Sequence, residues 1–507
     1  MKKILVLFLL VISNGLFAQV DLRKLDAYYS KALKDWDMPG MSIAIVKDGK
    51  VIFAKGYGVK EIGKNEQTDE HTLYAIASNT KAFTTAAIAM MVQEGKLSWD
   101  DKVKKHLPYF ELYDPYVSQE VTVRDILSHR VGLRTFSGDA IWYLSDNLPA
   151  SEIIKRARFL PRSYDFRSGY GYSNIMYITA GELMRVVSDK TWAENIQERI
   201  LNPLSMTRTI TTVKQLNQKG NFASPHGLFA GKHQPIAWED WESIAATGGI
   251  VSSVSDMANW MIFNLHQGVW KQDTLLTTAS RNMLWMPHNT FQVDHTSPTH
   301  STHFRGYALG WNVSDYHGRM RVSHPGGYSG MLSMVLLVPD ENLGIVVLTN
   351  GMKPLFSAVA NYTMDRFLKL PEKDWSADLL KNYSTRVAED QRIPDIKRAH
   401  VSGTKPSVGL DKLTGIYAAD IYGNIEVKQE GEKLRLYFEH SKRFNATLEH
   451  WHFDTWEIKW DNAELLSWFS FGTVHFILDN NLKVKALEFD VPNDDIWFDE
   501  LKPVKVK

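Results

Sequence analysis

The order of strand and helix patterns along the chain limits its fold more than any other feature. Residues 41–58 contain two runs of β-branched and apolar residues joined at Asp48-Gly49, a dipeptide that favours a tight hairpin turn. Helical patterns fill the middle of the chain. Strand patterns then return, over residues 307–313, 320–323, 330–338 and 343–349. This order predicts one sheet in which the first and last strands pair and helices pack on it, which is an α+β architecture.

A second structural unit is expected after this sheet. A last helical pattern ends near residue 370, and Pro371 begins a charged helical connector that finishes in a Gly- and Pro-containing linker at 401–407. From about residue 409 alternating strands replace the helical periodicity, and sixteen of the last 99 residues are aromatic. These features predict a small β-barrel or sandwich with a filled interior.

The N-terminus has the pattern of an export signal. Lys2 and Lys3 precede an apolar run over residues 4–12, and Ala18 ends a small-residue cleavage site. The alternative is a membrane anchor, but the run is shorter than the ~20 residues that span a bilayer. The chain has no cysteine, which excludes a lipid-anchored cysteine, a disulfide framework and a thiol nucleophile. We expect a periplasmic or secreted protein with no stable membrane anchor after cleavage.

Charge and composition are those of an ordinary globular protein. Lys plus Arg and Asp plus Glu both total 58, so no basic excess indicates binding to nucleic acid or to an anionic membrane. The chain is too long for one ordinary core. We divide it into a signal peptide at 1–18, an α+β domain at 19–370, a helical connector and linker at 371–408, and an all-β domain at 409–507.

A serine and a lysine three residues apart mark the start of an apolar helix. Ser78-Asn79-Thr80-Lys81 opens a run that continues through residue 92 and stops at Gly95. Positions i and i+3 share one helix face, so the Lys81 amine reaches the Ser78 hydroxyl and helps to remove its proton. The helix N-terminus adds partial positive charge and free N–H groups. A second match, Ser402-Gly403-Thr404-Lys405, lies in the linker with no helix after it, and we interpret it as a chance copy.

Two further short patterns lie beside predicted elements. Tyr172-Ser173-Asn174 ends a glycine-punctuated loop and leads into a helical segment at 175–187. His324-Pro325-Gly326-Gly327 ends a predicted strand. Partial copies at Tyr422-Gly423-Asn424 and His266-Gln267-Gly268 lack this placement. We therefore treat the first two patterns as candidate site motifs.

Three other stretches have structural interpretations. His129, in a turn after a helical pattern, is expected to hold that turn by hydrogen bonding and not to take part in chemistry. A small-residue turn at 246–253 precedes a helix that begins near Asp256, with Ser255 as its predicted cap. The loops at 138–148 and 285–305 are expected to shape a substrate cleft.

With the three motifs in this order, the chain resembles the serine β-lactamase and penicillin-binding-protein clan. Within it, the chain is most similar to the S12-type branch of class C β-lactamases, D-aminopeptidases, DD-carboxypeptidases and esterases, over residues 21–367. The resemblance implies a β-lactamase/transpeptidase-like antiparallel sheet with helices on both faces. The segment 409–507 resembles a lipocalin-like domain, expected to shield the cleft, restrict substrate length or mediate self-association.

The resemblance also implies roles for individual residues. It makes Ser78 the nucleophile, Lys81 its proton-accepting partner, and Tyr172 an acid/base whose phenolic pKa is depressed by Lys81. Asn174 would hold Lys81 and a substrate amide. The N–H groups of Ser78 and Gly327 would form an oxyanion hole, with Gly326 beside it in the strand motif. The implied reaction passes through an acyl-enzyme and uses no cofactor or metal.

The third motif departs from the lysine-threonine-glycine form common in this clan. His324 replaces a fixed cation by one expected to titrate near pH ~6.5, and Pro325 replaces a hydroxyl residue, so that one hydrogen-bond donor is lost. These changes weaken the case for binding a substrate carboxylate. We therefore rank hydrolysis of esters or D-amino-acid peptides, including peptidoglycan-derived ones, above efficient β-lactam hydrolysis.

Two other functions are alternatives. One is a non-catalytic penicillin-binding sensor of the same fold that forms at most a stable acyl adduct. The other is a metallohydrolase, because histidines and one aspartate gather in two segments. These are Asp294, His295, His300 and His303 in one segment, and His450 and His452 in the other.

Overall fold

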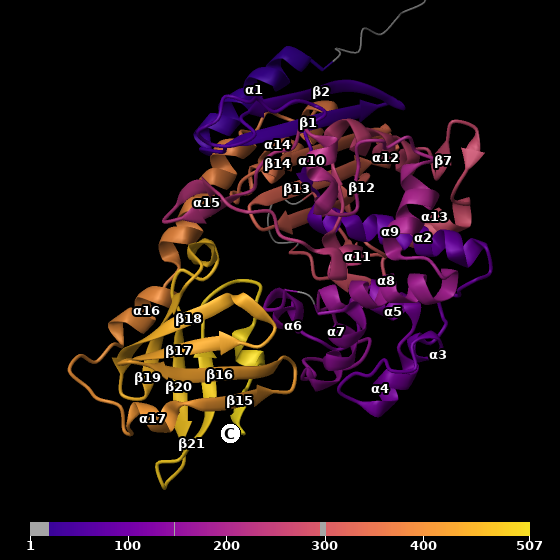
Figure 1. Ribbon diagram of the computed structural model, residues 1–507. Helices are drawn as coiled ribbons and strands as arrows, with labels where there is room; N and C mark the ends of the chain where they lie inside the picture. Colours follow the sequence, from indigo (N-terminus) through magenta and orange to yellow (C-terminus); the bar gives the residue numbers. More distant parts are fainter. Residues whose placement is uncertain (1–19, 147, 295–300, 507) are drawn as a thin grey trace, which may run out of the picture.

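The computed structural model describes residues 20–146, 148–294 and 301–506, and shows a helix-covered sheet and a barrel joined by two helices (Figure 1). The expected signal peptide lies outside these ranges. Within them, no helix combines the length and the apolar character that crossing a membrane requires. The resulting architecture is the expected α+β domain followed by an all-β domain.

One eight-stranded antiparallel sheet organises the first domain, in the order β2-β1-β14-β13-β12-β11-β10-β9. The predicted hairpin is β1 (Gly40–Lys47) and β2 (Lys50–Gly58). The last strand, β14 (Leu343–Thr349), pairs with β1 from Met41 opposite Thr349 to Lys47 opposite Leu343. The predicted pairing of the first and last strands is therefore confirmed.

The later strands differ from their predicted bounds. The single strand expected at 307–313 is two strands, β10 (Arg305–Tyr307) and β11 (Asn312–Tyr316), because a turn with Gly310 at φ +78° folds the chain back between them. The next strand, β12 (Arg319–Tyr328), is longer than expected and contains the whole His324 motif. It pairs with β13 (Met331–Val338), and β9 (Asn289–Phe291) ends the sheet beyond β10.

Helices cover both faces of the sheet, as the sequence resemblance implied. Alternate residues of a strand point to opposite faces, and the buried residues accordingly separate into two main clusters. One face packs against α1 (Leu22–Asp35) and α14 (Leu355–Phe367). The other packs against the helices of the central part of the chain, chiefly α2 (Thr80–Gln93), α8 (Asn174–Ser188) and α12 (Val254–Leu265).

The helix α2 is the buried central helix that its nearly encircling apolar residues predicted. Only Val92 and Gln93 at its end are not buried, and the chain leaves it through Gly95 at φ +70°. Shorter helices surround it on this side of the sheet (Figure 1). They are α3 (Val103–His106), α4 (Pro115–Glu120), α5 (Val123–Leu127), α6 (Asp139–Tyr143), α7 (Ala150–Arg156), α9 (Trp192–Ile196), α11 (Ala245–Gly248) and α13 (Thr278–Trp285).

The cap of α12 differs from the prediction. Ser253, not Ser255, accepts the hydrogen bond from the Asp256 N–H, at 3.3 Å. The Ser255 hydroxyl instead donates to the Glu70 carbonyl at 2.9 Å. The helix therefore starts two residues earlier than the apolar pattern indicated, with Asp256 inside its first turn.

The C-terminal domain is a closed eight-stranded barrel, the first of the two predicted forms. Two helices, α15 (Trp375–Glu389) and α16 (Arg392–Arg398), lead into it. Its strands are β15 (Gly415–Ala419), β16 (Gly423–Glu430), β17 (Lys433–Phe438), β18 (Ser441–His452), β19 (Thr455–Trp460), β20 (Thr473–Leu478), β21 (Val484–Asp490) and β22 (Val504–Lys505). Aromatic rings fill its interior, where Phe438, Phe444, Trp460 and Phe469 contact one another.

Candidate active site

Ser78 lies in a single 3₁₀ turn, Ala77–Asn79, that leads directly into α2. Ala77 adopts φ +46°, a left-handed conformation that costs energy for a residue with a Cβ. The turn is tied to β13, because the Asn79 amide donates to Ser333 Oγ at 2.9 Å and that hydroxyl donates to the Ile76 carbonyl at 2.8 Å. The sheet thus holds Ser78 rigidly at the start of the central helix.

Lys81 is fully buried and its amine touches the nucleophile. Its Nζ lies 3.1 Å from Ser78 Oγ, and it donates to Asn174 Oδ1 at 2.8 Å and to the Thr247 carbonyl at 2.9 Å. Burial lowers the pKa of Lys81 well below its ordinary value, although Asp139 nearby opposes the shift. A neutral amine uses two N–H groups on Asn174 and Thr247, so its lone pair remains for the Ser78 proton.

Tyr172 contacts both the nucleophile and Lys81. Its hydroxyl hydrogen-bonds with Ser78, its ring centroid is 4.8 Å from Lys81 Nζ, and its N–H donates to Thr135 Oγ1 at 3.2 Å. The expectation of a depressed phenolic pKa is wrong, since burial raises the pKa of Tyr172 well above its usual range. The expected cation beside it is missing because Lys81 is itself held towards the neutral form. Tyr172 is therefore a phenol and a proton donor.

Asn174, the first residue of α8, links the lysine to an acid that the sequence did not single out. Its Oδ1 accepts from Lys81 and from Thr247 Oγ1, the latter at 2.8 Å, and its Nδ2 donates to Asp139 Oδ2 at 2.6 Å. Asp139 is 2% exposed, and burial raises its pKa to about 8. Only its place in a predicted cleft loop, at 138–148, pointed towards it.

His324 is buried in β12 and is not a cation at neutral pH. Its Nδ1 donates to the Pro325 carbonyl at 2.6 Å, which leaves Nε2 to accept from the Tyr307 hydroxyl at 3.2 Å. Burial lowers the pKa of His324 to about 3, with a smaller contribution from Lys81. The expected titration near neutrality is therefore wrong, because the ring is 2% exposed.

The two glycines of this motif have different surroundings. A Cβ on Gly326 would lie 2.2 Å from the Ile76 carbonyl oxygen and 2.4 Å from Ser333 Oγ, so only glycine fits beside the Ser78 turn. A Cβ on Gly327 would meet only Leu332, at 3.6 Å. The strand β11 pairs with β12 no further than Ser323, so no strand of the described residues lies beside one backbone edge of residues 324–328.

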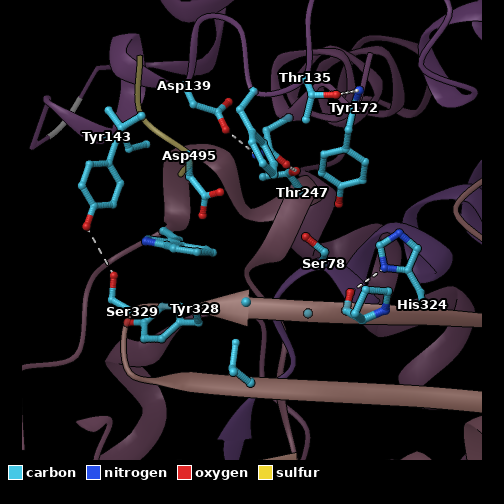
Figure 2. A pocket seen from close by; sticks show the side chains of 18 of the residues that line it. Ser78, Thr135, Asp139, Tyr143, Tyr172, Thr247, His324, Tyr328, Ser329 and Asp495 are labelled. Carbon is cyan, nitrogen blue, oxygen red and sulfur yellow. Dashed lines mark hydrogen bonds between the residues drawn. The ribbon is translucent and has the colours of Figure 1, made fainter. Parts of the chain in front are cut away.

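These residues line a cavity of about 500 Å³ (Figure 2). Its walls are largely aromatic and come from both domains, with Trp468, Asp495 and Ile496 supplied by the barrel. Among the described residues that line it there is neither lysine nor arginine, and its acidic side chains are Asp139 and Asp495. The pocket therefore favours a substrate that is neutral or cationic.

The remaining candidate residues have structural roles. His129 is buried and makes a structural hydrogen bond, but the bond joins its turn to the Tyr172 motif instead of closing the turn itself, since Nδ1 accepts the Ser173 N–H at 3.0 Å. Ser402 lies exposed in a turn. His450 Nε2 donates to the Phe453 carbonyl at 2.8 Å, and His452 Nδ1 accepts the Val401 N–H at 3.2 Å.

The proposed metal segment is only partly described. His303 pairs with Asp315, with 2.6 Å between Nδ1 and Oδ2, and Asp294 also has a partner. His295 and His300 lie outside the described residues. Within the residues that the structure places, no three His, Asp or Glu side chains are arranged to hold a metal ion.

The fold and the site together define a serine hydrolase of the β-lactamase and penicillin-binding-protein type. The model of the β-lactamase family matches residues 25–368, and the chain belongs to this family. A second family model, described only as a domain of unknown function, matches residues 399–502, which include most of the barrel.

Known relatives are similar over most of the chain. An unguisins hydrolase of Aspergillus campestris is 27% identical over 433 residues, which are 80% of this chain and 78% of that protein. Protein flp of Staphylococcus aureus (strain MW2) is 29% identical over 334 residues, 65% of this chain and 63% of its own. The octameric penicillin-binding protein homologue from Pyrococcus abyssi has the same fold, with a TM-score of 0.62, 23% identity, and coverage of 96% of this chain and 100% of its own.

Proposed function

We propose that this serine hydrolase acts through an acyl-enzyme on Ser78 and cleaves esters or amides of small acyl donors. The observation that carries the proposal is the 3.1 Å contact between Ser78 Oγ and a buried Lys81 whose pKa is lowered. A serine hydroxyl is a poor nucleophile unless a neighbouring group takes its proton. Lys81 has the position and the protonation state to do so.

The reaction follows from the contacts of these groups. Lys81 takes the Ser78 proton as Oγ attacks the carbonyl carbon, and N–H groups at Ser78 and Gly327 stabilise the oxyanion. Tyr172 donates its proton to the leaving oxygen or nitrogen and regains one from the Lys81 ammonium. In the second half, water attacks the acyl carbon, its proton passes to Lys81, and Ser78 Oγ is reprotonated as it leaves.

Substrate preference follows from the charges of the pocket. A β-lactam carries a carboxylate, but His324 is neutral and the described lining has no lysine or arginine. We therefore place esters and D-amino-acid peptides, including peptidoglycan-derived ones, above β-lactams as substrates. The unguisins hydrolase among the relatives supports hydrolysis, at 27% identity.

Steady-state hydrolysis of p-nitrophenyl propionate by matched serine variants tests the assignment. Ser78→Ala should lower kcat by about 10³-fold or more, because the nucleophile is lost. The control is Ser402→Ala, which removes the serine of the second Ser-x-x-Lys match and should retain wild-type rates. Equal rates for Ser78→Ala and wild type would refute the proposal, and a wild-type adduct without turnover would favour a penicillin-binding sensor.

Export is a separate part of the proposal. It rests on the sequence pattern of residues 1–18, with cleavage after Ala18. N-terminal sequencing of the protein recovered from the periplasm or medium of a bacterial host should begin at Gln19. An uncleaved N-terminus on protein retained in the cytoplasm would contradict it.

A further inference from the structure

Two carboxyl groups from different domains enter the catalytic pocket. Asp139 comes from the start of α6, and Asp495 comes from the barrel segment that follows β21. Figure 2 shows both carboxyl groups on one side of Ser78, whereas Tyr172 and His324 lie on the other side. Tyr172 protonates the leaving group in the proposed reaction, so the acyl group extends towards the two carboxyl groups.

The barrel segment that carries Asp495 is held in place from several sides. The Asn493 side chain closes it as a compact loop, donating to the Val491 and Ile496 carbonyls at 2.8 Å each and accepting the Asp495 N–H at 3.0 Å. Arg392 of α16 donates to the Asn493 carbonyl at 3.0 Å. Asp495 therefore projects into the pocket from a fixed backbone.

The Asp139 side of the pocket is fixed by the same part of the barrel. The buried Glu500 carboxylate accepts from Ser137 Oγ at 2.6 Å and from the Gly138 N–H at 2.8 Å, and it pairs with Arg134 at 3.2 Å. The Trp497 indole donates to the Thr135 carbonyl at 2.8 Å. These bonds join the Asp495 loop to the residues directly before Asp139, so the two carboxyl groups keep one relative position.

Asp495 has no counter-charge in the described part of the chain. No side chain of the described residues donates a hydrogen bond to the Asp495 carboxyl group or forms an ion pair with it. Burial, together with the nearby charge of Asp494, raises the pKa of Asp495 to about 6. A carboxylate in such a place is stabilised by a bound cation. The aromatic walls, which include Trp142, Trp241 and Trp468, favour a cation as well.

We propose that Asp495, beside the neutral Asp139 carboxyl group, forms a subsite for a protonated amine on the acyl group, so that the preferred substrates are esters or amides of acids with a free amino group. This inference rests on the proposed function of Ser78. It gives the barrel a direct part in choosing the substrate, since one of the two carboxyl groups belongs to it. A neutral acyl group of the same shape leaves Asp495 without a partner and is bound less well.

A matched pair of esters tests the subsite at pH 7, where Asp495 is ionised. The substrates are the p-nitrophenyl esters of D-alanine, L-alanine and propionate, the last of which has the same carbon skeleton without the amine. Each rate is corrected for spontaneous hydrolysis. We expect kcat/KM for the ester of one alanine enantiomer to exceed that for the propionate ester by about tenfold or more, which is the effect of one charged contact. Asp495→Asn should reduce this ratio about tenfold.

The control variant is Asp420→Asn, an exposed aspartate of the barrel that does not line the pocket, and its ratio should equal that of wild type. A wild-type ratio near one, or an unchanged ratio in folded Asp495→Asn, would overturn the subsite while Ser78-dependent hydrolysis still supports the proposed function. If neither ester is hydrolysed in a Ser78-dependent way, the proposed function fails and the subsite fails with it. The wild-type ratio decides the question even where Asp495→Asn does not fold.

Discussion

At the scale of single residues, burial favours the neutral form of four titratable groups at the site. It lowers the pKa of Lys81 and of His324, and it raises the pKa of Tyr172 and of Asp139. In each case the neutral form is favoured, because a low-dielectric site penalises charge. The site therefore starts with an amine that accepts a proton and a phenol that donates one.

The pH dependence of ester hydrolysis follows from these states. The active form of Lys81 is the free amine, so kcat/KM should fall as the pH is lowered through its depressed pKa. The pKa of His324, about 3, lies too low to contribute between pH 5 and 9. In His324→Gln the position of this fall should be the same as in wild type, measured by initial rates across that range. A fall that moves or disappears in His324→Gln would show that the histidine is the titrating group.

The extent to which the sequence predicted the site also depends on single residues. Ser78, Lys81, Tyr172, Asn174 and His324 stand in short motifs at element boundaries, where the chemistry imposes a local pattern. Thr247, Asp139 and Asp495 do not, because only tertiary contacts bring their loops to the pocket. The expected pKa of Tyr172, depressed, and that of His324, near its ordinary value, are wrong for the same reason, since burial is a property of the folded chain.

At the scale of elements, the site depends on the close approach of β12 to the turn that precedes α2. Their backbones meet at Gly326, and Ser333 on the neighbouring strand ties the same turn through hydrogen bonds. The sequence predicted these elements because each has a strong periodic pattern. It misplaced the cap of α12 because Ser253 and Ser255 are both suitable cap residues near the helix start, and the contact that occupies Ser255, with the Glu70 carbonyl, is tertiary.

Replacing Gly326 by alanine should disturb the packing of β12 against the Ser78 turn. In Gly326→Ala the added methyl would lie 2.2 Å from the Ile76 oxygen, so β12 or the Ser78 turn must move. We expect the free energy of unfolding to fall by about 1–3 kcal/mol, the usual cost of overpacking. Denaturant unfolding measures it. Gly327→Ala, whose methyl meets only Leu332 at 3.6 Å, is the matched comparison, and an equal loss in both variants would contradict this account.

At the scale of the whole molecule, the barrel is part of the active site. It supplies three lining residues, and its contacts with the first domain support the loop that carries Asp139. A further link joins Arg443 of β18 to Glu239, whose carboxylate also accepts from Ser329 at the pocket. The expected roles of this domain in shielding the cleft, restricting substrate length or mediating self-association stay predictions.

Removing the central interdomain contact should affect both stability and activity. Glu500→Ala leaves the Ser137 hydroxyl and the Gly138 N–H without their acceptor, which should cost about 1–3 kcal/mol of unfolding free energy and lower kcat/KM. The comparison is Asp499→Ala. Asp499 also pairs with Arg134 but is exposed, so its loss should cost about 1 kcal/mol or less. Urea unfolding and ester kinetics on both variants check this, and equal effects would argue against a special role for Glu500.

The central claim is that Ser78 forms the covalent intermediate. The most direct test is acid quenching of the enzyme during turnover of a p-nitrophenyl ester, followed by intact mass measurement and peptide mapping. We predict that the wild type gains the mass of one acyl group on the peptide that contains Ser78, and that Ser78→Ala gains none. An acyl group mapped to another residue, or sustained turnover by Ser78→Ala, would contradict the account.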